Sequence, residues 1–124
     1  MPETERDLLD LLRELSALYT DMRAAVESVH SMPKQGVASS FKFGMGYGGL
    51  RMAVMACGFP VRYVTPQAWQ KELQCLTAGD KMVAVRRAQE LFPSFDWPKT
   101  KCGKLAIADA LLIAEWLRRS EIGK

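Results

Sequence analysis

The sequence lacks the long apolar runs that mark membrane proteins, and its first residues lack the pattern that is typical of a secretion signal. No apolar stretch reaches the roughly 18 residues that a membrane-spanning helix needs, because Arg51, Asp109 and Glu115 interrupt the longest ones. The N-terminus is acidic and has neither the basic nor the apolar region of a signal peptide. We therefore expect a cytoplasmic protein with no membrane association.

Metal-binding patterns of cysteine and histidine are also lacking. The three cysteines, Cys57, Cys75 and Cys102, form no Cys-x-x-Cys pair, and His30 is the single histidine. A structural zinc site needs four such ligands at closer spacing. Free thiols in a reducing compartment are therefore expected.

What the chain does contain is enough apolar sequence for one globular domain over residues 1–124. Of its 124 residues, 48% are hydrophobic and 25% are charged. The net charge of +3 hides an asymmetry: residues 1–21 hold six acids and two bases, whereas the rest of the chain carries a net charge of +7. A basic body suits a polyanion such as nucleic acid, and a merely solvated basic surface is the alternative.

Hydrophobic spacing predicts the element order α-β-α-β-α-α-α, and two strands separated by a helix are typical of a parallel α/β unit. Thr4 and Thr65 are expected to cap helices, with Pro66 at the first helical position. The expected helices span residues 7–19, 37–58, 65–73, 77–91 and 105–119, the strands 22–29 and 59–64, and the loops 30–36 and 93–103.

The expected helix 37–58 contains four closely spaced glycines, each of which weakens a helix by roughly 1 kcal/mol relative to alanine. Such glycines are expected where the backbone approaches another group closely. They are Gly44, Gly46, Gly48 and Gly49.

Two acids lie in mostly apolar surroundings and are the candidate metal ligands. Glu27 falls inside the first expected strand, and Asp109 falls inside the apolar run 105–114. An exposed helix position is the alternative for Asp109, but its apolar neighbours favour a place lining a cleft. Two buried carboxylates brought together would repel each other unless a divalent cation neutralised them. A magnesium site for phosphoryl chemistry is therefore one hypothesis.

Three collinear motifs resemble the RuvC-like Holliday junction resolvases, especially phage-type members. The first is the stretch 26–44 (VESVHSMPKQGVASSFKFG), the second is Tyr63-Val-Thr-Pro-Gln-Ala-Trp69, and the third is Ala108-Asp-Ala-Leu-Leu-Ile-Ala114. The resemblance covers residues 22–118.

This resemblance implies an α/β, ribonuclease H-like fold with a small sheet flanked by helices, in a bacterial or phage-infected cell. In this family clustered carboxylates hold two divalent cations, Mg²⁺ or Mn²⁺, that activate water against a DNA phosphodiester. Glu27 matches the family's glutamate on the central strand, and Asp109 matches its aspartate on the final helix. Lys81 matches a basic position near the scissile phosphate.

The chain also departs from the family pattern. The family begins with a strand that carries an aspartate, and no residue here matches it. Another acid usually precedes the helix aspartate by three or four residues, where this chain has Ala106 and Leu105. We therefore expect a shortened relative that lacks the N-terminal catalytic strand and binds its cation weakly. The unpaired sheet edge would favour a homodimer or another oligomer.

Basic residues along the chain are the candidate DNA contacts, by analogy with phosphate-binding surfaces. Phe41, Phe43 and Tyr47 lie among them and could stack on nucleotides, or could serve as core or dimer contacts. His30 is either a catalytic or phosphate-contacting residue or an ordinary loop residue. The basic candidates are Lys34, Lys42, Arg51, Lys81, Lys101 and Lys104.

The function expected from these residues is magnesium-dependent cleavage of branched DNA by a structure-selective endonuclease. The alternative is a non-catalytic DNA-binding or dimerisation module derived from that family. A remaining alternative is an unrelated α/β protein in which the motifs are fortuitous.

Overall fold

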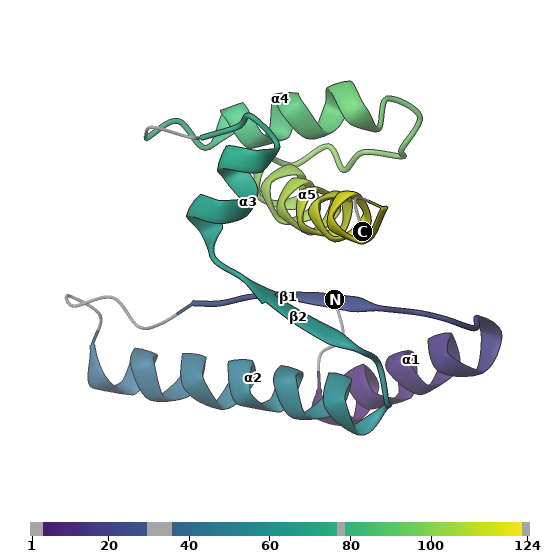
Figure 1. Ribbon diagram of the computed structural model, residues 1–124. Coiled ribbons are helices and arrows are strands. Elements are labelled where there is room, and N and C mark those ends of the chain that lie inside the picture. Colours follow the sequence, from purple (N-terminus) through teal and green to yellow (C-terminus); the bar gives the residue numbers. More distant parts are fainter. Residues whose placement is uncertain (1–3, 30–35, 77–78, 123–124) are drawn as a thin grey trace. The chain divides into compact units, whose positions relative to one another are not determined.

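The structure is a computed structural model that describes residues 4–29, 36–76 and 79–122 (Figure 1). It confirms the α/β class and the predicted order of elements. None of the helices in this described part is both long and apolar enough to cross a bilayer. The elements are α1 (Glu5–Leu18), β1 (Ala24–Glu27), α2 (Val37–Ala56), β2 (Val61–Val64), α3 (Pro66–Glu72), α4 (Met82–Leu91) and α5 (Lys101–Ile122).

Strands β1 and β2 form a two-stranded parallel sheet, with α2 as the connection between them (Figure 1). The Ala24 backbone N–H donates to the Pro60 carbonyl at 2.9 Å. Both strands are shorter than predicted. Gly58, at a φ of +80°, makes the turn between α2 and β2, so the chain must reverse there before pairing can begin.

The chain divides into two compact units, residues 1–62 and 63–124. In the first unit α1 packs along α2. Thr4 caps α1 as predicted, since its hydroxyl accepts from the Asp7 N–H at 3.0 Å. No residue of α1 is fully buried, and Val54 is the one fully buried residue of α2. Helices α1 and α2 therefore contribute few fully buried residues to a hydrophobic core in this unit.

The second unit has a dense core in which α3 and α4 pack on α5. Thr65 caps α3, accepting from the Ala68 N–H at 3.2 Å, with Pro66 in the first turn as predicted. This start directs Trp69 inward, where 1% of its surface is exposed, beside the fully buried Leu73 and Leu112.

The predicted loop 93–103 is wrong at its C-terminal end, because α5 begins at Lys101 rather than at residue 105. The Thr100 hydroxyl accepts from the Gly103 N–H at 3.0 Å, and the Thr100 carbonyl accepts from the Lys104 N–H at 3.0 Å. A Cβ on Gly103 would lie 2.8 Å from the Pro98 Cβ. Glycine is thus required for the first turn of α5 to pack against Pro98, and it does not mark a loop.

The glycines of α2 also differ from expectation. A Cβ built on Gly44, Gly46 or Gly48 would meet nothing within 4 Å, and one on Gly49 would meet only the Glu5 carboxylate at 4.0 Å. The prediction of a close backbone approach within the described chain is therefore wrong. These glycines instead leave open space along the helix.

Candidate functional site

Glu27 is the last residue of β1, and it follows the buried Val26. The glutamate itself is half-buried. The Tyr47 hydroxyl of α2 donates to the Glu27 backbone carbonyl at 2.8 Å. This hydrogen bond ties the end of the strand to the middle of α2 and fixes the backbone from which the carboxylate extends.

Tyr47 is also the centre of a row of side chains on α2. Its ring stacks on Phe43, with centroids 6.1 Å apart and an interplanar angle of 11°. The Arg51 guanidinium lies 5.6 Å from the Tyr47 centroid. The spacing of four residues places all three on one helix face. The predicted alternative that the aromatic residues of this helix are core contacts fits the half-buried Tyr47. It does not fit Phe41, which is 70% exposed.

An apolar cavity of about 530 Å³ lies beside Glu27. Its residues come from the start of α1, from β1 and its C-terminal end, and from the face of α2 that carries Tyr47. The charged residues that border the cavity are the acids Glu5 and Glu27 and the base Lys42. The lining residues are Thr4, Glu5, Leu8, Val26, Glu27, Val29, Lys42, Phe43, Gly46, Tyr47, Gly49 and Leu50.

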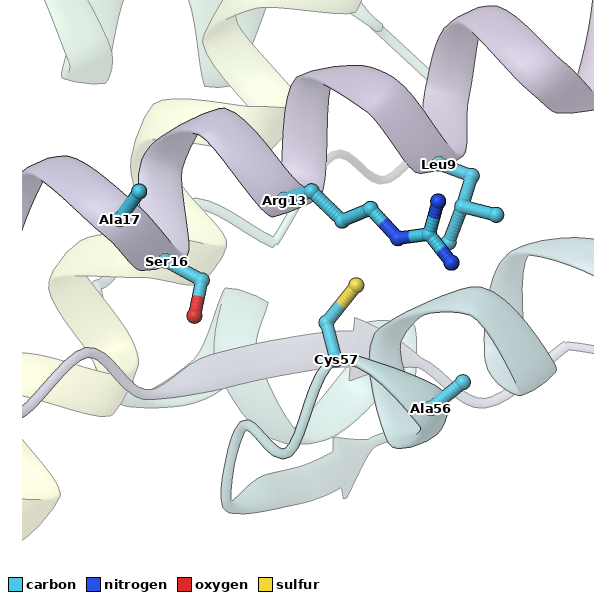
Figure 2. Close-up of a pocket in the computed structure, with 6 residues that line it drawn as sticks. All are labelled: Leu9, Arg13, Ser16, Ala17, Ala56 and Cys57. Atoms are coloured by element: carbon cyan, nitrogen blue, oxygen red, sulfur yellow. The ribbon is translucent and has the colours of Figure 1, made fainter.

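A second cavity of about 260 Å³ lies between α1 and the C-terminal end of α2. Figure 2 shows the Arg13 guanidinium and the Cys57 thiol facing this space, with Ser16 nearby. No carboxylate lines it. This cavity therefore adds no ligand to the candidate metal site.

Asp109 lies in the middle of α5 and is exposed, so the expectation that it lines a cleft is wrong for the unit that contains it. The buried face of α5 passes through Ala108, Leu112 and Glu115, and Asp109 lies beside that face. Burial raises the pKa of the nearby Cys75 thiol; Arg87 opposes this shift and the Asp109 charge adds to it.

Glu115 is the buried acid of this unit, and sequence reasoning missed it. The Arg118 guanidinium donates to its two oxygens at 2.7 and 2.8 Å, and Arg119 donates at 2.9 Å. The Arg118 hydrogen bonds are the main reason that the pKa of Glu115 falls to about 2. Arginines three and four residues after an apolar-flanked glutamate were the signal in the sequence. The carboxylate is fully engaged, which indicates a structural role.

Lys81 is the residue before α4, which begins at Met82 and therefore later than the predicted start at residue 77, and its neighbour Asp80 organises this region. One Asp80 oxygen accepts from the Met82 N–H at 3.0 Å, and the other accepts from Arg86 at 3.0 Å. The Arg86 hydrogen bond is the largest cause that lowers the pKa of Asp80, and the Lys101 charge also contributes. Lys101 therefore lies close enough to Asp80 for its charge to act on that carboxylate.

The predicted site residues fall into both units. Glu27, Lys42 and Arg51 lie in the first unit, whereas Lys81, Lys101, Lys104 and Asp109 lie in the second. Lys34 and His30 lie outside the described residues. Within residues 4–29, 36–76 and 79–122, no group of three or more histidine, cysteine, aspartate or glutamate side chains is placed to hold a metal ion.

No protein-family model matches the chain, and no curated protein sequence matches it.

Proposed function

We propose that this protein is a RuvC-like resolvase relative with a ribonuclease H-like fold that binds branched DNA and cleaves it with a divalent cation. The observation that supports this most is the place of Glu27 at the end of β1 in a parallel β-α-β unit, with Asp109 on the last helix. This is the chain order that the three resolvase-like motifs require.

Glu27 and Asp109 would hold the cation, Mg²⁺ or Mn²⁺. Carboxylate oxygens are the donors that these ions prefer, and Mg²⁺ usually keeps several waters beside one or two carboxylates. The bound ion would neutralise charge on a scissile phosphate. Binding through only two protein carboxylates would be weak, and the described part of the chain contains no group of three or more candidate ligands.

The chain's other residues would position the DNA. Lys81, before α4, and Lys101 and Lys104, in the first turn of α5, supply positive charge for backbone phosphates. Lys42 and Arg51 supply it on α2. Phosphate contacts of this kind orient a duplex without reading its sequence, which suits recognition of a branched structure.

The test is cleavage of a labelled four-way DNA junction at low salt with Mg²⁺. The proposal predicts site-limited cleavage that is abolished by Glu27→Gln and by Asp109→Asn, while Glu90→Gln, on the exposed surface of α4, cleaves normally. Cleavage that survives Glu27→Gln would point to a contaminating nuclease. Absence of junction binding by the unaltered chain would overturn the proposal.

A second candidate function, a non-catalytic dimerisation module, is favoured by one face of α2. The residues of this face recur at spacings of three or four residues, and its large apolar side chains are exposed, from 56% at Met45 to 89% at Val37. Such spacing forms the seam between paired helices, and a glycine within it permits close approach. The seam consists of Val37, Phe41, Met45, Gly48, Met52 and Met55.

Sedimentation measures this alternative directly. A dimer is expected for the unaltered chain, and Met45→Glu combined with Met52→Glu should give a monomer, because each places a charge in the seam. Ser39→Glu, an exposed position of the same helix outside the seam, should leave the dimer intact. A monomeric unaltered chain would exclude this function.

A further inference from the structure

We infer that the cavity bordered by β1 and α2 receives a single unpaired DNA base that carries an amino group. The inference rests on the proposed DNA-binding function and specifies which part of the DNA this cavity binds. It concerns one unit of the chain alone, since every residue lining the cavity lies within residues 4–50.

The size and walls of the cavity suit a flat aromatic group. A volume of about 530 Å³ falls within the range of roughly 300–1,000 Å³ that is usual for small-molecule sites. Leu8, Val26 and Leu50 supply aliphatic wall, and Phe43 and Tyr47 supply aromatic wall. Unpaired bases stack on aromatic side chains regardless of sequence, because every base has a π face.

The polar groups at the border of the cavity favour a nucleotide whose base carries an amino group and whose phosphate can pair with a lysine. The Glu5 carboxylate lies 4.0 Å from the Cβ position of Gly49, so it reaches over α2 at the cavity. A carboxylate accepts hydrogen bonds from an amino group such as that of cytosine. Thymine has no such group and is expected to bind less well. Lys42, an exposed residue at the same border, can pair with the phosphate.

Gly46 keeps the α2 side of the cavity open, and this offers a matched pair of variants. A Cβ on Gly46 or on Gly44 would meet nothing within 4 Å, and both residues are exposed positions of α2. Gly46 lines the cavity and Gly44 does not. Leucine at either position raises helix propensity equally, but only at Gly46 does it fill the space.

The experiment uses a four-way junction with one 2-aminopurine, an amino-bearing fluorescent base, at the branch point. Emission is read at saturating protein, and binding is read in the same samples by gel mobility. The unaltered chain and Gly44→Leu should change emission relative to the free junction, because the base leaves the DNA stack and packs on Phe43 and Tyr47. Gly46→Leu should lose most of that change, and the smaller Gly46→Ala should lose part of it. Circular dichroism checks that each variant folds.

The outcomes separate this inference from the proposed function. Equal emission from Gly46→Leu and Gly44→Leu, with the junction bound, would overturn the base-binding cavity and leave DNA binding intact. A junction that the unaltered chain does not shift at low salt would overturn both. A thymine-analogue probe that responds as strongly as 2-aminopurine would overturn the role of Glu5.

Discussion

The Tyr47 hydroxyl donates a hydrogen bond to the backbone carbonyl of Glu27 at 2.8 Å. The two residues lie twenty positions apart, in the middle of α2 and at the end of β1, so this bond ties the strand end to the helix that connects the two parallel strands. It also holds the strand end next to the apolar cavity of about 530 Å³. The position of Glu27, the candidate metal ligand, therefore depends on α2, a helix in which only Val54 is fully buried.

Loss of this bond should weaken the first unit. Tyr47→Phe keeps the ring that stacks on Phe43 and removes only the hydroxyl, so the expected loss is about 1 kcal/mol of unfolding free energy. Urea unfolding measures it. The exposed Tyr19 provides the control, and Tyr19→Phe should leave stability unchanged. Equal effects of the two changes would show that the Glu27 contact contributes nothing.

The Glu115–Arg118–Arg119 cluster predicts a pH dependence of stability. Folding lowers the pKa of Glu115 from its ordinary 4.5 to about 2. The ionised carboxylate therefore stabilises the fold above pH 4.5, by at most about 3 kcal/mol. This contribution is lost as the pH falls from 4.5 toward 2.

Glu115→Gln should accordingly destabilise the chain by about 1–3 kcal/mol at pH 7, and the difference from the unaltered chain should shrink toward pH 2. Thermal melts between pH 2 and pH 7 measure it. Glu90→Gln removes an exposed ion pair with Arg87 and should change stability by under about 0.5 kcal/mol at every pH. A constant penalty for Glu115→Gln across this range would contradict the assigned pKa.

Local sequence patterns predicted the helices and strands, whereas they did not predict which faces of those helices pack together. Threonine caps at Thr4 and Thr65 and the helical spacing fixed the starts of α1 and α3, because caps act within one turn. The Thr100 hydroxyl caps α5 in the same way, but Pro98 and the lysines around it favoured the prediction of a loop over residues 93–103. The exposure of Asp109 depends on which face of α5 meets α3 and α4, and an apolar run does not specify that face.

Gly103 offers a test of the corrected start of α5. Gly103→Ala places a Cβ 2.8 Å from both the Pro98 Cβ and the Thr100 hydroxyl, so one of them must move. The expected cost is about 1–3 kcal/mol of unfolding free energy. Gly44→Ala, in open space on α2, should instead stabilise by up to about 1 kcal/mol. If Gly103→Ala and Gly44→Ala both stabilised the chain, Gly103 would not pack against Pro98, and the close contact would be contradicted.

Junction binding should depend steeply on salt, because each phosphate contact releases a counterion. Lys42→Gln and Lys101→Gln should each reduce the slope of log affinity against log salt by about 1. Fluorescence anisotropy at several salt concentrations measures the slope. Lys71→Gln, an exposed residue of α3 outside the proposed contacts, should leave it unchanged. Identical slopes for all three variants would exclude these lysines as phosphate contacts.

We propose that Glu27 of β1 and Asp109 of α5 share one ion, and a manganese-soaked crystal tests this most directly. We expect an anomalous scattering peak coordinated by carboxylate oxygens of both Glu27 and Asp109, and no peak in crystals of Glu27→Gln. Crystals that place the two carboxylates on opposite sides of the molecule, or that show manganese elsewhere, would contradict it.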